Sequence, residues 1–195
     1  MHAILSATLL VEVRPEQWKE PTPCTEWNVR EVVAHLVGMD PVFAATIEGG
    51  PMPERGVDHL GDDPVGVYRS SSASLLAAFS GPGVLERSYS GPLGSATGAE
   101  RLQIRLYDLL AHGWDLAQAT GIPARLPEDL AGQVLAFAQA QLSAQSRTGR
   151  FAEPRPVEET SSALGAPVDF TFCPSGSVTR CGSAPRRAVT ERPSS

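Results

Sequence analysis

Cysteine and aromatic residues are scarce in this chain of 195 residues. Aromatic side chains make up 6% of it, which suggests that not every segment contributes to a core. The three cysteines, Cys24, Cys173 and Cys181, form no CxxC pair and cannot all be joined to one another. A zinc knuckle and a disulfide framework are therefore excluded, and a reducing cytoplasm is the expected compartment.

Long apolar runs and an excess of positive charge are also missing. Residues 3–11 are apolar, but no Lys or Arg precedes them and no small-residue cleavage pattern follows before Glu12, so they predict a short helix rather than a signal peptide. No other run approaches the ~20 apolar residues that span a bilayer. The 16 Lys and Arg against 22 Asp and Glu give a net charge of −6, which repels phosphate backbones. We expect neither a membrane nor a nucleic acid as partner.

Helical signals fill the first three quarters of the chain. Asn28 followed by Glu31 predicts a capping box, Pro64 suits a first helical turn, and Gly121 followed by Pro123 marks a helix end. Residues 49–63 predict an exposed loop, and residues 81–98 a loop or short extended piece. The expected fold class is all-α, with five helical segments at about residues 3–13, 28–47, 64–80, 99–121 and 127–145.

The amino-acid composition changes after about residue 151. Prolines and serines become frequent, and apolar residues are too scattered to form a stripe. We therefore expect two regions, a helical bundle over residues 1–150 and a poorly ordered Pro/Ser-rich tail over residues 151–195. A frameshifted ending would produce the same change in composition.

Asp108 and His112 are four residues apart in the strongest helix, so both side chains project from one face and are able to share a metal ion. This spacing also arises by chance, and an ion pair on the helix surface is the alternative. At 100° per residue both lie at the border of a stripe formed by Leu102, Leu106 and Leu109, where a bundle helix faces its neighbour.

His35 occupies the same kind of border on the second helix, beside Val32. Taken alone, it is better explained as a hydrogen-bonded core histidine. Together with Asp108 and His112 it provides ligands from two helices, which is how bundle cores build metal sites.

Two stretches resemble the signatures of a known family. TPCTEWNVREVVAHLVG, residues 22–38, and DLLAHGWDLAQATG, residues 108–121, are similar to those of an actinobacterial metal-binding family related to the N-terminal domain of mycothiol-dependent maleylpyruvate isomerase, in the DinB-like superfamily. The resemblance covers about residues 13–142. It implies a DinB-like four-helix bundle that binds a divalent metal through His35, Asp108 and His112.

Two imidazoles and one carboxylate leave an open position on a divalent ion, as in catalytic sites. Zinc fits these donors best, although iron, nickel or manganese would also accept them. A small thiol bound there would lose its proton and become a nucleophile toward an electrophilic substrate. The resemblance implies that mycothiol is this thiol.

Five other side chains are candidates for a role, four of them within the signature stretches. Asp115 is expected either to accept the second N–H of His112 or to lie exposed on the helix surface. Trp27 and Trp114 are expected to pack between helices, and Cys24 to be a buried structural thiol. His59, amid acidic residues, is expected to be solvated.

The functional expectation is a metal-binding protein that acts as a mycothiol-dependent transferase or isomerase-like enzyme. The isomerase's second domain is not expected in this chain, so a non-catalytic metal-binding bundle or a decayed family member is the alternative. A bundle without metal is a third reading. The sequence does not give the substrate, and the helical faces leave a homodimer open.

Overall fold

The computed structural model describes residues 4–24, 27–54, 59–91, 94–124 and 127–144. Helices dominate this part of the chain: α1 (Ile4–Glu12), the 3₁₀ helix η1 (Pro15–Lys19), α2 (Val29–Glu48), α3 (Pro64–Phe79), α4 (Gly98–Thr120) and α5 (Glu128–Ala144). Two short strands, β1 (Ser88–Gly91) and β2 (Gly94–Thr97), pair as an antiparallel hairpin. The all-α class is thus confirmed, with one added hairpin, whereas the proposed tail lies outside the described residues and stays a prediction.

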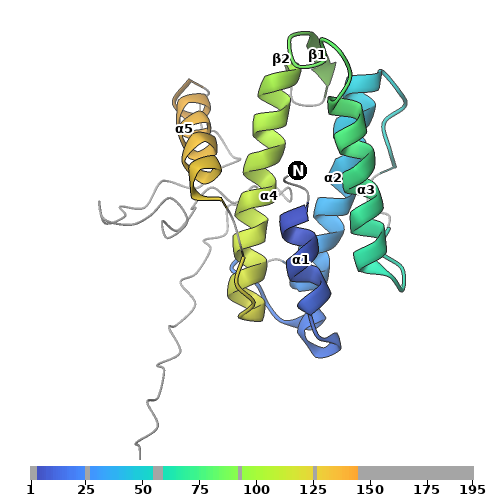
Figure 1. Ribbon diagram of the computed structural model, residues 1–195, viewed down its shortest axis with the longest axis vertical. Coiled ribbons are helices and arrows are strands. Elements are labelled where there is room, and N and C mark those ends of the chain that lie inside the picture. Colours follow the sequence, from blue (N-terminus) through green and yellow to red (C-terminus); the bar gives the residue numbers. More distant parts are fainter. Residues whose placement is uncertain (1–3, 25–26, 55–58, 92–93, 125–126, 145–195) are drawn as a thin grey trace, which may run out of the picture.

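Helices α1 to α4 lie side by side as a four-helix bundle (Figure 1). Helix α2 packs against α3 and α4, and the shorter α1 also contacts α3 and α4. Helix α5 packs against α4 on the outside of the bundle, and the hairpin lies at one end, between α3 and α4 in the sequence. The DinB-like bundle expected from the sequence is confirmed.

Local capping interactions define where the long helices begin. The side chain of Asn28 accepts a hydrogen bond from the Glu31 backbone, and Glu31 in turn accepts one from the Asn28 backbone, which is the predicted capping box. Helix α4 has a second capping box between Thr97 and Glu100. It ends at Gly121, whose positive φ of 69° glycine adopts without strain. These interactions fix the register of the helices that contain the candidate ligands.

The main core lies at the centre of the bundle. It is built from fully or almost fully buried apolar side chains of α1, α2, α3 and α4, together with one loop residue: Leu9, Leu10, Val29, Val32, Val33, Leu36, Val37, Leu60, Tyr68 and Leu116. Leu60 corrects the prediction of an exposed loop at residues 49–63, because it is completely buried. This leucine attaches the end of that loop to the bundle.

The inward face of α4 differs from the predicted leucine stripe. Leu102, Leu106 and Leu109 are only partly buried. The most buried face of α4 is instead largely polar, and it carries Arg101, Arg105, His112, Asp115 and Leu116. The predicted stripe also included Gly113 and Leu116, and both are buried. The stripe was therefore right in part, but the centre of the buried face lies on the polar side of it, because ion pairs and hydrogen bonds allow charged side chains to be buried.

Arg101 attaches the hairpin to the end of the bundle. Its Nη2 donates hydrogen bonds to the backbone carbonyls of Tyr89 and Gly94, each at 2.7 Å, one on either strand. The side chain is almost completely buried. Arg101 thus has a structural role, since it joins both strands of the hairpin to α4.

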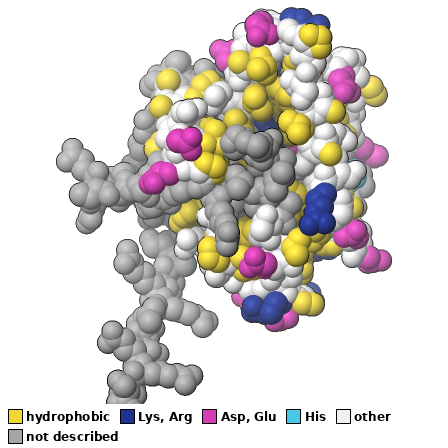
Figure 2. All heavy atoms as spheres, in the orientation of Figure 1, with side chains coloured by type: hydrophobic (Ala, Val, Ile, Leu, Met, Phe, Trp, Pro, Cys, Tyr) yellow, Lys and Arg dark blue, Asp and Glu magenta, His cyan; other side chains and the backbone are white. Residues whose placement is uncertain are grey.

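Charged side chains of both signs are interspersed on the face shown in Figure 2. Among the coloured, described side chains of that view, Lys and Arg do not gather into a stripe. Among the described helices, none has both the length and the apolar character needed to cross a membrane.

Candidate metal centre

Three predicted ligands from two helices meet inside the bundle. His35 projects from α2, and Asp108 and His112 project from successive turns of α4. Oδ1 of Asp108 lies 3.1 Å from Nε2 of His35 and 3.5 Å from Nε2 of His112. One possible ligand atom of each residue lies within 4.8 Å of the other two. The structure therefore brings together the three side chains that the sequence singled out.

The cluster is shielded but not sealed from solvent. The side chains of His35 and Asp108 are 9% and 13% exposed, whereas that of His112 is 1% exposed. His112 is thus fixed inside the bundle, while the other two border its surface. A small molecule approaching the cluster would reach it from the side of His35 and Asp108.

Asp115 holds the second nitrogen of His112. Its Oδ2 lies 3.0 Å from Nδ1 of His112, and Asp115 is itself buried. A carboxylate accepts, so the Nδ1–H of His112 donates to it, and in the neutral imidazole this leaves Nε2 with a free lone pair. Of the two expectations for Asp115, the outer hydrogen-bond partner is the one the structure supports.

Trp27 packs directly over both imidazoles. The centroid of its ring system lies 4.8 Å from that of His35 and 5.6 Å from that of His112. The turn before α2 holds it there, because Thr22 Oγ1 donates to the Trp27 carbonyl and the Trp27 N–H donates to the Cys24 carbonyl. The predicted role of packing between helices was thus incomplete, since Trp27 also forms a wall of the cluster.

Arg105 and Asp40 extend the cluster beyond the predicted residues. The guanidinium of Arg105 donates through Nη1 to Oδ2 of Asp108, and through Nε and Nη2 to Oδ1 of Asp40 at 3.0 and 2.6 Å. Nη2 also donates to the backbone carbonyl of Leu36, at 2.7 Å. The side chain of Arg105 is completely buried and that of Asp40 is 1% exposed. Neither residue was identified from the sequence.

The network continues into α3. Ser71 Oγ donates to Oδ2 of Asp40 at 2.7 Å, and Ser72 Oγ lies 3.4 Å from the same oxygen. Asp40 therefore has partners on both carboxylate oxygens, from α3 on one side and from α4 on the other. This arrangement connects three helices of the bundle to the candidate ligand Asp108.

Neighbouring charges and hydrogen bonds outweigh the effect of burial on the pKa of Asp108 and on the pKa of His112. Burial by itself would raise the pKa of Asp108, but the hydrogen bond with His35 and the charges of His35, Arg105 and His112 hold this pKa well below its usual range. Burial would likewise lower the pKa of His112, but its hydrogen bond with Asp115 and the charges of Asp108 and Asp115 raise it. Asp108 is therefore ionised at neutral pH, and His112 binds a proton more tightly than a free imidazole does.

The cluster has more carboxylates than cations. Asp40 and Asp108 pair with the guanidinium of Arg105, whereas Asp115 contacts the imidazole of His112. With neutral imidazoles, two negative charges are left without a compensating positive charge in a largely buried cluster. Uncompensated buried charge is costly, so protons on the histidines or a divalent cation would stabilise it.

A signal for the two missed residues was present in the helical pattern. Asp40 follows Leu36 by four residues and precedes Phe43 by three, so it continues the buried apolar face of α2. Arg105 precedes Asp108 by three residues and His112 by seven, on the same face of α4. A carboxylate and a guanidinium at core positions of two neighbouring helices predict a buried ion pair.

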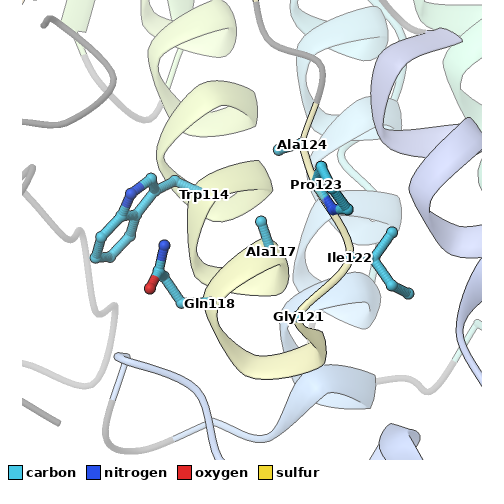
Figure 3. A pocket seen from close by; sticks show the side chains of 7 residues that line it. All are labelled: Trp114, Ala117, Gln118, Gly121, Ile122, Pro123 and Ala124. Carbon is cyan, nitrogen blue, oxygen red and sulfur yellow. The ribbon is translucent and has the colours of Figure 1, made fainter. Parts of the chain in front are cut away.

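The other singled-out side chains lie apart from the ligand cluster. Cys24 is completely buried, as expected, and His59 is exposed. Trp114 is partly buried and lines an open pocket of about 410 Å³ with Gln118 and the segment after α4 (Figure 3). In Figure 3 Trp114 and Gln118 point to one side of α4, and none of the three candidate ligands lines this pocket.

Comparison with known proteins places the chain among relatives. Two uncharacterized proteins of Mycobacterium tuberculosis, from the strains CDC 1551 / Oshkosh and H37Rv, are each 34% identical to it over 141 residues. The aligned part covers 72% of this chain and 75% of each relative. No solved structure matches the chain significantly.

The family comparison covers most of the bundle, the whole of the first signature stretch and residues 108–117 of the second. The model of the mycothiol maleylpyruvate isomerase N-terminal domain matches residues 5–117, more than half of the chain. This range includes His35, Asp108, His112 and the network around them. The chain belongs to the family of mycothiol maleylpyruvate isomerase N-terminal domains.

Proposed function

We propose that this protein binds one divalent metal ion through His35 Nε2, Asp108 Oδ1 and His112 Nε2. The observation that carries the proposal is the convergence of these three atoms in a cluster where, with neutral imidazoles, three carboxylates are matched by one guanidinium. A divalent ion brings the charge that the cluster lacks. Membership in a family of helical metal-binding domains supports the same conclusion.

Two of the three donor separations are close to those around a small tetrahedral ion, and all three donors lie within 4.8 Å of one another. Zinc–nitrogen and zinc–oxygen bonds of about 2.0–2.2 Å imply donor separations of roughly 3.3–3.6 Å along a tetrahedral edge. The Asp108 oxygen lies 3.1 and 3.5 Å from the two imidazole nitrogens, close to that range. Two imidazoles and a carboxylate suit zinc well, and ferrous iron also accepts this set.

Three protein ligands leave one position for an exogenous molecule. A divalent ion bound there supplies Lewis acidity, which lowers the pKa of a coordinated thiol. The chain contributes the ligand geometry, the Asp115 hydrogen bond that orients His112, and the Trp27 wall that restricts access of water. We propose a thiol-dependent transferase or isomerase-like reaction, in which the family relationship points to mycothiol as the thiol and an electrophilic small molecule as its acceptor.

A thiol titration of the cobalt-substituted protein tests this function. We expect mycothiol, or a simpler thiol, to produce an intense sulfur-to-cobalt charge-transfer band, because an open position exchanges water for thiolate. An alcohol of similar size is the control and should leave the spectrum unchanged. Asp108→Ala should weaken the band by loosening the ion.

A spectrum that does not respond to saturating thiol would exclude the thiol-dependent reaction. The protein would then be a non-catalytic metal-binding bundle, the second candidate function. That alternative predicts stoichiometric metal and greater thermal stability with metal, but no turnover of electrophiles with any thiol.

Metal uptake is expected to decrease as the pH falls. Each imidazole must lose the proton on Nε2 before it binds a metal, so protons and metal compete for the same atoms. Because the pKa of His112 is raised, this competition should begin at a higher pH than for a free imidazole, whose pKa is about 6.5. Zinc affinity measured by chelator competition between about pH 5 and 8 checks this; an affinity independent of pH would argue against histidine ligands.

A further inference from the structure

The two oxygens of Asp108 have different partners. Oδ1 faces the two imidazole nitrogens at 3.1 and 3.5 Å, whereas Oδ2 accepts a hydrogen bond from Nη1 of Arg105. Arg105 is three residues earlier on the same helix, and its side chain is completely buried. One oxygen is thus directed at the candidate metal position, and the other is already bound.

Arg105 is itself held in place by groups on a different helix. Asp40 Oδ1 accepts from both Nε and Nη2, and the Leu36 carbonyl accepts from Nη2. Ser71 of α3 donates to the other oxygen of Asp40. A guanidinium presents several donors in a fixed plane, so these contacts determine the direction in which Nη1 points.

We infer that Arg105, held by Asp40, is a positioning residue that makes Asp108 bind the metal through Oδ1 alone. This inference rests on the proposed metal site and assigns its coordination mode. With Oδ2 bound to Arg105, Asp108 takes up one coordination position instead of two, which leaves room for an exogenous ligand.

The test compares two buried arginines on the same face of α4. Arg105→Lys keeps the charge but loses the planar fork, and Arg101→Lys is the matched control, because Arg101 contacts the hairpin carbonyls instead of the ligand cluster. A second variant, Arg105→Met combined with Asp40→Asn, removes one charge of each sign, so that the net charge of the cluster is unchanged and Asp40 is not left as an unpaired carboxylate. Each protein is assayed for zinc affinity by chelator competition, for its cobalt absorption spectrum and for its unfolding midpoint.

We expect Arg105→Lys and the double variant to bind zinc roughly 10- to 100-fold more weakly than wild type, as found for outer partners of metal ligands. The visible cobalt bands should also lose intensity, because a carboxylate that binds through both oxygens raises the coordination number. Arg101→Lys should lower the unfolding midpoint without changing zinc affinity or the cobalt spectrum. A merely structural role for Arg105 would give the Arg101 pattern instead.

Unchanged zinc affinity and an unchanged cobalt spectrum in the folded Arg105 variants would overturn the inference while leaving the metal site intact. If neither Arg105 variant folds, the near-isosteric Asp40→Asn decides by the same two readouts, since it keeps Arg105 but weakens what holds it. A wild-type protein that binds no metal would overturn the proposed function itself, and this inference with it.

Discussion

His112→Ala is expected to abolish stoichiometric metal binding while leaving the helical content largely unchanged. His112 is the most buried of the three candidate ligands, with a side chain only 1% exposed, and Asp115 fixes the direction of its ring. Its removal takes away one of three protein ligands, which should cost more than the roughly 10- to 100-fold loss typical of outer partners. Metal content per chain after purification without a histidine tag, together with circular dichroism, measures both effects. His35→Ala should behave in the same way.

Graded controls make this result specific. Asp115→Asn leaves all three ligands in place and should lower affinity by only about 10- to 100-fold. His59→Ala removes an exposed histidine and should change nothing. Trp27 gives an independent readout, because its ring contacts both imidazoles and its fluorescence should be quenched by cobalt in wild type but not in His112→Ala. Stoichiometric metal in the His35→Ala/His112→Ala double variant would refute the proposed ligand set.

Gly98→Ala is expected to destabilise the fold by about 2 kcal/mol or more. Gly98 is the first residue of α4, and a Cβ atom there would overlap the carbonyl oxygen of Val84 and lie 2.9 Å from its carbonyl carbon. The Gly98 N–H also donates to the Arg87 carbonyl at 2.9 Å, so the two backbones cannot separate without losing that bond. Because the obstacle is backbone, no side-chain rotation relieves it. Chemical denaturation of both proteins measures the difference.

A second glycine provides the matched control. Gly132 lies inside α5, is exposed, and would meet nothing within 4 Å if it gained a Cβ atom. Gly132→Ala should therefore stabilise the protein slightly, by roughly 0.5–1 kcal/mol, because alanine favours the helix. Equal effects of the two substitutions would mean that the close approach at Gly98 does not exist in solution.

Local sequence signals were enough to predict the helices and the three clustered side chains. Helix boundaries depend on residues close to them in the sequence. Asn28 with Glu31, Pro64 and Gly121 each lie at a helix boundary close to the predicted position. The Asp108 and His112 spacing is likewise local, since four residues of helix bring both side chains to one face. His35 was grouped with these two because it lies at the same kind of border on the second helix, and the family resemblance implied the same three residues.

The tertiary structure alone decided which face of α4 is buried. The sequence predicted the leucine stripe, whereas the bundle buries Arg101, Arg105, His112 and Asp115. Burial of these groups is favourable only because their partners come from elsewhere in the fold: the Tyr89 and Gly94 carbonyls for Arg101, and Asp40 and the Leu36 carbonyl for Arg105. A hydrophobicity pattern scores such side chains as exposed, since it does not include partners distant in sequence. The sequence by itself thus determined the helices and the chemical character of the candidate ligands, and only the packing of α2, α3 and α4 determined the network around Asp108.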